Sequence, residues 1–404
     1  QIIWQIPIDY CRFRADNGRI STDILSHSST KKSIDQNSLD GQKLIKDFLG
    51  ASDNARNEDL ISLLKKDGQK EPAVITADGF LINGNRRKWA LEKLYEDTGS
   101  DKFQYINVVI LPGTGDPESP TLKDIALLEY RYQGQKTGKS EYTEMNKALR
   151  YRANKKNGLP LKAMLKDDAA YSNLDDKKFK IALKKFDDDH FGTLRIIDQY
   201  LSANKMEGNY KKVETKWDSF KELNQKVLNK LKDDKFLALQ NIDSDEVGAI
   251  ENACFNIMKL DDTKKTGGGA KVDTIREINK WIKNKKKIFL ELSKVEDVSD
   301  EFIDEDEREK EWQFTQGEIV ANTIKRLKAL IAKKELQEGP LDRLEEALKK
   351  LDHKNLDEAQ IKRMPLREFE KAMELCNSIQ TASRDLHSIF WEKVKNFKDL
   401  GKKK

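Results

Sequence analysis

A glycine followed by two arginines, where a helix is expected to start, is the feature of this sequence best suited to chemistry. Gly84-Asn85-Arg86-Arg87 follows a short apolar run and precedes a helical pattern. A glycine at such a junction lets the backbone turn sharply and approach a ligand closely. The first-turn amides of a helix carry partial positive charge and suit a phosphate. A guanidinium adds a planar donor fork for phosphate oxygens, so this segment is a candidate phosphate-binding site.

Two short strands must position this glycine. The run from Pro72 to Thr76 is β-prone, Asp78-Gly79 is a turn pair, and Phe80 to Asn83 forms a second strand, so the pattern predicts a hairpin. The remaining elements expected around the hairpin are an opening strand at 2–8, a polar loop or insertion at 21–42, a helix at 58–66 capped by Asn57, a helix at 88–95 and a closing strand at 106–111.

This order of elements resembles the ParB/sulfiredoxin-like superfamily over residues 1–140, with little specificity from there to 205. Ile6-Pro7-Ile8-Asp9 would be the family's opening, and Gly84-Asn85-Arg86-Arg87 would match the phosphate-binding Gly-Glu-Arg-Arg of ParB proteins. Sulfiredoxins carry a reactive cysteine in this loop. Asn85 stands at that position, so sulfinic-acid reduction is excluded. The resemblance implies an α+β N-terminal domain that binds a nucleotide through these four residues.

ParB proteins carry a second motif, Glu-Asn-x-x-Arg, that contacts the triphosphate and its magnesium. Glu129 matches the first position, but Tyr130 replaces the asparagine and Gln133 replaces the arginine, while Arg131 could substitute through its long side chain. The resemblance therefore implies CTP or ATP with Mg²⁺, Glu129 as metal ligand and catalytic residue, and Arg131 as a further nucleotide contact. The lost asparagine puts hydrolysis more in doubt than binding, so we expect a weak NTPase or none.

The segment from Gly134 to Ser140 resembles a P-loop but fails the test for one. It has three residues between its glycines instead of four, and it follows a helix rather than a strand. We interpret it as a basic interdomain loop. Lys136 and Lys139 in this loop could still contact phosphate, either of the nucleotide or of DNA.

The next segment, 141–209, lies where ParB proteins carry a helix-turn-helix DNA reader. Leu161 to Leu165 would be its first helix and Phe191 to Leu201 its recognition helix, with Thr193 and Arg195 facing the groove. The stretch between these helices is too long for a tight turn, and a generic helical bundle explains the segment about equally well.

Composition limits the remaining possibilities. The chain has 404 residues with 75 Lys+Arg and 70 Asp+Glu, a net charge of +5 that does not by itself indicate a nucleic-acid binder. Its three cysteines and four histidines are scattered, so a zinc site is not expected. No apolar run is long enough to span a membrane and no signal peptide is visible. We expect a cytoplasmic protein, associated with the nucleoid if it binds DNA.

Residues 210–404 are predicted to be α-helical and highly charged. Thr266-Gly267-Gly268-Gly269 is expected to be a flexible loop, and Gly339-Pro340 a break between helices. These helices offer a surface for a homodimer or another protein partner.

Three functions remain open. The first is a nucleotide-binding, ParB-like, DNA-associated protein in which phosphate contacts switch DNA or partner binding. The second is a phosphoryl-transfer enzyme or nuclease on the same fold, with Glu129 or Asp78 as base or metal ligand. The third is a helical partner-assembly protein with a degenerate nucleotide site. Fold alone does not choose among them, and we expect the first, with slow or absent hydrolysis.

Overall fold

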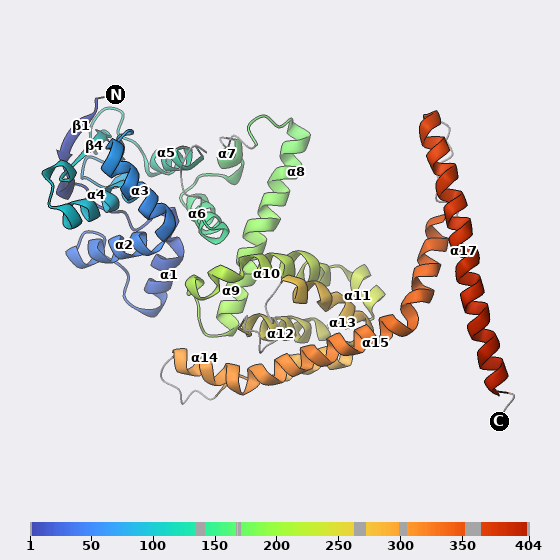
Figure 1. The fold of residues 1–404 in the computed structure, drawn as a ribbon. Helices are drawn as coiled ribbons and strands as arrows, with labels where there is room; N and C mark the ends of the chain where they lie inside the picture. Colours follow the sequence, from blue (N-terminus) through green and yellow to red (C-terminus); the bar gives the residue numbers. More distant parts are fainter. Residues whose placement is uncertain are drawn as a thin grey trace. The chain divides into compact units, whose positions relative to one another are not determined.

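The structure is a computed structural model that describes residues 2–134, 142–166, 168, 171–261, 272–298, 305–351 and 365–401. The chain divides into two compact units, Gln1–Lys328 and Ala329–Lys404. It is mostly helical, with a small mixed sheet near the N-terminus (Figure 1). An α+β region followed by a helical region is therefore confirmed. No helix among the described residues has the length and apolar content to cross a lipid bilayer.

The sheet has four strands in the order β1-β4-β2-β3. Their bounds are β1 Trp4–Pro7, β2 Ala73–Ile75, β3 Leu81–Asn83 and β4 Tyr105–Ile110. The strand β4 pairs antiparallel with β1 and parallel with β2, and β2 pairs antiparallel with β3. The predicted hairpin is thus present, and Gly79 at its turn has φ +89°. Helices connect the other strands.

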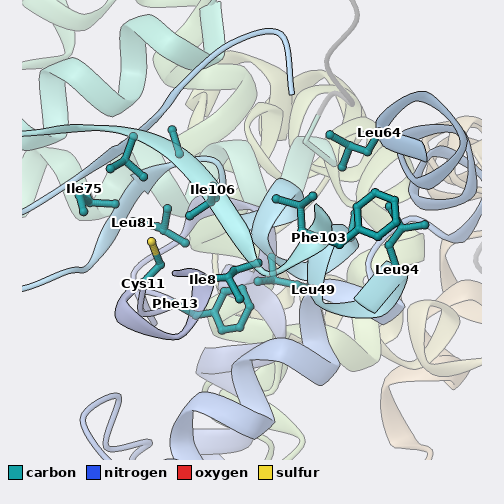
Figure 2. Packing of buried hydrophobic residues seen from close by; sticks show 14 of the residues in the cluster. Ile8, Cys11, Phe13, Leu49, Leu64, Ile75, Leu81, Leu94, Phe103 and Ile106 are labelled. Carbon is teal, nitrogen blue, oxygen red and sulfur yellow. The ribbon is translucent and has the colours of Figure 1, made fainter. Parts of the chain in front are cut away.

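Helices cover both faces of this sheet. The covering helices are α2 Leu39–Ala51, α3 Asn54–Asp67, α4 Asn85–Thr98 and α5 Leu122–Gly134. The first three pack on one face and build the main core, where Leu49, Leu64 and Leu94 meet the strand residues Ile75 and Ile106 (Figure 2). A smaller cluster on the opposite face joins strand residues to apolar residues of α5.

The polar stretch expected to be a loop at 21–42 is largely helical, which corrects that prediction. Helix α1, Ser21–Thr30, and the start of α2 occupy it. Thr22 is fully buried, and its amide donates to Oδ1 of Asn146 at 2.8 Å. Its hydroxyl group donates to Glu214 at 3.2 Å. Contacts with residues far along the chain therefore stabilise a helix whose Ser-rich sequence has little propensity of its own.

The helical region contains several helices, two of which continue directly into a π-helical segment. Its elements before the second unit are α6 Glu144–Lys156, α7 Leu161–Lys166, α8 Asp176–Phe186, a π-helical segment Asp187–Gly192, α9 Thr193–Ala203, α10 Trp217–Leu223, a second π-helical segment Asn224–Leu228, α11 Asp234–Gln240, α12 Glu246–Lys259, α13 Val272–Glu291 and α14 Glu305–Phe314. The break between α6 and α7 covers Asn157 to Pro160, where glycine and proline disfavour a continuous helix.

Two long helices end the chain, α15 Gln316–Leu351 and α17 Leu366–Gly401. The backbone of α15 stays helical through Gly339 and Pro340, so the predicted break there is wrong. The predicted flexible loop at 266–269 lies outside the described residues.

Candidate phosphate-binding site

Gly84 forms the junction between β3 and α4 and must be a glycine. Its φ is +102°, a conformation that side chains rarely allow, and an added Cβ would lie 2.6 Å from the Cβ of Ala73. The helical hydrogen bonds of α4 begin with the amide of Lys88, which donates to the carbonyl oxygen of Gly84 at 2.9 Å. The three preceding amides lie ahead of this ladder. No side chain caps the helix, so its N-terminus is suited to an anion.

A second element fixes the direction of Arg86. Its Nε donates to Oδ1 of Asn57 at 2.8 Å. The Nδ2 of Asn57 donates in turn to the carbonyl oxygens of Leu49 at 3.2 Å and Gly50 at 3.0 Å. Because the amide nitrogen faces two acceptors and the oxygen faces a donor, only one orientation of this amide satisfies all three contacts. Asn57 is 2% exposed, so it holds Arg86 from inside α3.

Three buried polar atoms beside Gly84 lack a hydrogen-bond partner in the described part of the chain. They are Nδ2 of Asn83, Oδ1 of Asn85 and Nη2 of Arg86. Two of the three are donors. A buried donor without an acceptor destabilises a fold by about 1–3 kcal/mol. An anion at the start of α4 would supply acceptors to such donors.

The electrostatics at Arg86 also favour an anion. Burial, together with the positive charges of Arg19 and Arg56, lowers the pKa of Arg86 to about 10, and Asp53 and Asp59 oppose this shift. The folded chain thus disfavours the charged guanidinium until a negative group approaches. A phosphate would reverse that penalty, which makes Arg86 the strongest candidate for contact.

Arg87 is less available than Arg86. Its Nη1 donates to the carbonyl oxygen of Glu71, and its Nη2 lies 3.6 Å from the carboxylate of the same residue. Burial lowers the pKa of Arg87, and Glu71 opposes that shift. A phosphate would have to compete with Glu71 for this side chain.

Glu129 lies in a buried ion pair on α5. Its carboxylate accepts from Nη2 of Arg150, and Nη1 of Arg150 donates to the carbonyl oxygen of Asp16 at 2.8 Å. Glu129 is 5% exposed. Burial raises the pKa of this carboxyl group, and Arg150 and Arg14 oppose the rise. The geometry makes Glu129 a link between α5, α6 and the segment that carries Asp16.

The segment from Asp16 to Arg19 also contacts α6 and Tyr142 just before it. An added Cβ on Gly18 would lie 2.8 Å from Cε2 of Tyr142, so the chain needs a glycine there. The guanidinium of Arg19 lies 5.0 Å from the centre of the Tyr142 ring. Nδ2 of Asn146 donates to the carbonyl oxygen of Arg19 at 3.0 Å. The sequence indicated Asn57 only as a helix cap and did not single out Arg19 or Arg150, because the role of each depends on partners far along the chain.

The other predicted residues lie in several places. Arg131 is exposed on α5, and the side chains of Tyr130 and Gln133 and all of Lys136 and Lys139 lie outside the described residues. Asp78 lies in the hairpin turn, where Thr76 donates to it at 2.5 Å.

The predicted recognition helix needs correction. The helices α8 and α9 are joined through the π-helical segment without an intervening turn, so Phe191 to Leu201 is not a separate helix. Thr193 is fully buried and donates to the carbonyl oxygen of Asp189 at 2.6 Å. It therefore does not face a DNA groove, whereas Arg195 is exposed.

Among the described residues, no group of three or more His, Cys, Asp or Glu side chains is placed to hold a metal ion. Glu129 pairs with an arginine instead of with other carboxylates. This donor set does not form a protein magnesium site. Comparison of the chain with protein-family models, curated proteins and solved structures found no match.

Proposed function

We propose that this chain binds a nucleotide, CTP or ATP, through its phosphates at the N-terminus of α4, and that residues 1–140 form a ParB/sulfiredoxin-like domain. Nucleotide binding would switch how the helical region contacts DNA or a partner. Gly84 would admit the phosphate, the amides of residues 85–87 would donate to it, and Arg86 would supply the principal charge.

One observation carries this proposal. Nη2 of Arg86 is buried without an acceptor in the described part of the chain, beside an uncapped helix start, while Asn57 holds the same guanidinium in place. A surface arginine would instead point into water. Keeping a buried donor in one direction without an acceptor fits a site prepared for an anion.

Glu129 has a different role in this proposal from the one that the family resemblance implies. Its carboxylate is engaged by Arg150, so no catalytic step is assigned to it. Magnesium would then be bound chiefly by the phosphate oxygens and water, as is common for this ion. The proposal is therefore binding with slow or absent hydrolysis, rather than phosphoryl transfer or nuclease activity.

Calorimetric titration tests the proposal. The purified chain is titrated with CTP, ATP, GTP and ADP in the presence of magnesium, and we expect one of them to bind with a micromolar Kd. Arg86→Ala should abolish binding and leave the circular dichroism spectrum unchanged. Arg276→Ala, which removes an exposed arginine of α13, is the control and should bind normally. Normal binding by Arg86→Ala would show that the site is wrongly placed.

A second candidate function, assembly with a partner through the C-terminal helices, is favoured by the surface of α17. This helix exposes large apolar side chains, namely Met373, Leu375, Ile379, Leu386, Ile389, Phe390, Trp391 and Val394. Exposed apolar surface of this extent often marks a protein interface. Light scattering at micromolar concentration tests it. A homodimer that Trp391→Lys dissociates would support this function. A monomer that binds nucleotide would argue against it and leave only the first proposal.

A further inference from the structure

The positive charge of this chain is concentrated in one segment. Residues 155–185 contain nine lysines and four aspartates, a net charge of +5 that equals the net charge of the whole 404-residue chain. These residues cover the end of α6, all of α7 and nearly all of α8 (Figure 1). The rest of the chain is balanced in charge.

All nine lysines are exposed: Lys155, Lys156, Lys162, Lys166, Lys177, Lys178, Lys180, Lys184 and Lys185. Among the described residues, only Lys178 has a carboxylate within ion-pair distance, at 3.3 Å from Asp175. Lysines elsewhere are often paired, as Lys286 is with Glu246 at 2.7 Å. A lysine run is usually a solvated helix face with interspersed acids. This surface differs because its acids do not neutralise it.

The arrangement on α8 puts five lysines on one broad face. Phe179 and Phe186 are buried, and they lie seven residues apart on the inner face of the helix. The helical period then places Lys177, Lys180 and Lys184 along one side of the outer face, and the other two lysines along the other side. The helix has 11 residues and is about 16 Å long. A duplex presents many phosphates over that distance.

We infer that the exposed lysines of α6, α7 and α8, the lysine surface, dock the phosphate backbone of duplex nucleic acid without reading its sequence. Lysine is a flexible point charge, which suits backbone contact better than base recognition. The described aromatic rings of the segment do not provide open stacking platforms, because Phe179 and Phe186 are buried and the half-buried Tyr171 packs edge-on against Phe186, with ring centroids 6.4 Å apart. Binders of unpaired bases use exposed aromatic rings, so a duplex fits better than a single strand.

The lysine surface has a defined edge. Asp187, Asp188 and Asp189 follow it in the π-helical segment, and Lys221 and Gln225 of the α10 region bind Asp189. The acidic residues would repel phosphate on that side. The duplex is therefore expected along α7 and α8, and not over α9, where Thr193 is buried. This inference rests on the nucleic-acid part of the proposed function and is independent of its nucleotide part.

Fluorescence anisotropy with a labelled random-sequence duplex of about 20 base pairs tests the inference, since that length exceeds the span of α8. The full chain is titrated at several salt concentrations. Lys177, Lys180 and Lys184 are changed together to Glu, and in a second variant to Gln. The control changes Lys65, Lys66 and Lys70, which are exposed on and just after α3, to Glu, so that net charge falls equally. Thermal unfolding confirms that each variant is folded.

We expect the α8 variants to bind the duplex at least about tenfold more weakly, with the slope of log K against log salt reduced by roughly 2 to 3. The control should stay within about threefold of the parent chain. Equal losses in the α8 and control variants would overturn the inference. So would a parent chain that binds single strands or anionic vesicles but not the duplex.

Nucleotide titration of the same α8 variants separates the two proposals. If they bind nucleotide normally but lose the duplex, both proposals stand. If no form of the chain binds nucleotide while the duplex still depends on α8, the proposed nucleotide site fails and the lysine surface is supported.

Discussion

Nε of Arg86 donates to Oδ1 of Asn57 at 2.8 Å, across 29 residues of sequence. This contact joins the start of α4 to the interior of α3, and the two further bonds from Asn57 join both to the end of α2. The guanidinium is therefore positioned by three helices that pack on the same face of the sheet. Rigid support of this kind is what a binding site for a small anion requires.

Removal of Asn57 should weaken phosphate binding as well as stability. In Asn57→Ala, Arg86 loses its anchor and two buried carbonyl groups lose a donor. We expect an affinity for nucleotide about tenfold lower and a free energy of unfolding about 1–3 kcal/mol lower, measured by calorimetry and urea denaturation.

Asn256→Ala is the matched control for this change. The Nδ2 of Asn256 also donates to two carbonyl groups, those of Leu292 and Val295, at 2.8 Å and 3.3 Å. The control should lose comparable stability with no change in nucleotide affinity. If both variants lost affinity equally, Asn57 would act only through general stability.

Replacement of Arg86 by a neutral side chain should remove an unfavourable charge from the ligand-free chain. The lowered pKa of Arg86 shows that the folded state disfavours its charge at neutral pH. The guanidinium is partly exposed, and Oδ1 of Asn57 loses its donor in Arg86→Met. Because these effects offset each other, we expect the free energy of unfolding to change by no more than about 1 kcal/mol at neutral pH. The same variant should lose nucleotide binding.

The sign of the pH effect follows from the lowered pKa. Above about pH 10, Arg86 releases its proton in the folded chain but keeps it in the unfolded chain. Its unfavourable contribution therefore fades as the pH rises through that value. The free energy of unfolding of Arg86→Met, relative to that of the parent chain, should therefore be higher near pH 8 than at pH 10.5, as judged from urea unfolding at both values. If the stability of Arg86→Met relative to the parent chain increased with pH, the lowered pKa would not belong to Arg86.

Local signals in the sequence identified the hairpin and the junction at Gly84. The turn pair at Asp78-Gly79 and the apolar runs beside it are short-range features, and each fixes its own conformation. The buried Thr22 shows the opposite case, because its helix depends on Asn146 and Glu214, which lie 124 and 192 residues away. No window of local sequence contains those partners.

The sequence also did not predict that Asn57 is a buried bridge between helices. It was expected to cap a helix, but Asp53 is the cap of α3, and its side chain accepts from the amide of Arg56 at 3.4 Å. Asparagine suits both a cap and a buried bridge, and only the packing of α2, α3 and α4 decides between them. The continuous α8–α9 helix was missed for a similar reason, since a π-helical segment leaves no distinct periodic pattern.

Substitution at Gly84 should disrupt the junction itself. In Gly84→Ala, the added Cβ would clash with Ala73 and oppose a φ of +102°. We expect a loss of about 1–3 kcal/mol in the free energy of unfolding and loss of nucleotide binding. Gly248→Ala is the control, because nothing lies within 4 Å of its added Cβ on α12. The control should be neutral or slightly stabilising in urea unfolding. Equal stability of both variants would contradict the geometry of the junction.

Breaking the ion pair between Arg150 and Glu129 should make stability depend on pH. Both side chains are buried, at 9% and 6% exposure, and removal of one partner from a buried pair destabilises a protein by about 3–5 kcal/mol. In Arg150→Met, the pKa of Glu129, already raised by burial, should rise further because its main opposing charge is lost. The folded chain then holds a proton that the unfolded chain releases, so its stability falls as the pH rises through the new value. We expect the loss to be largest above roughly pH 7 and smaller near pH 5, as measured by urea denaturation.

The double variant Glu129→Leu with Arg150→Met should recover most of the stability at neutral pH, because it leaves neither charge buried alone. A loss in Arg150→Met that stayed constant between pH 5 and pH 8 would show that Glu129 is not the group that Arg150 neutralises.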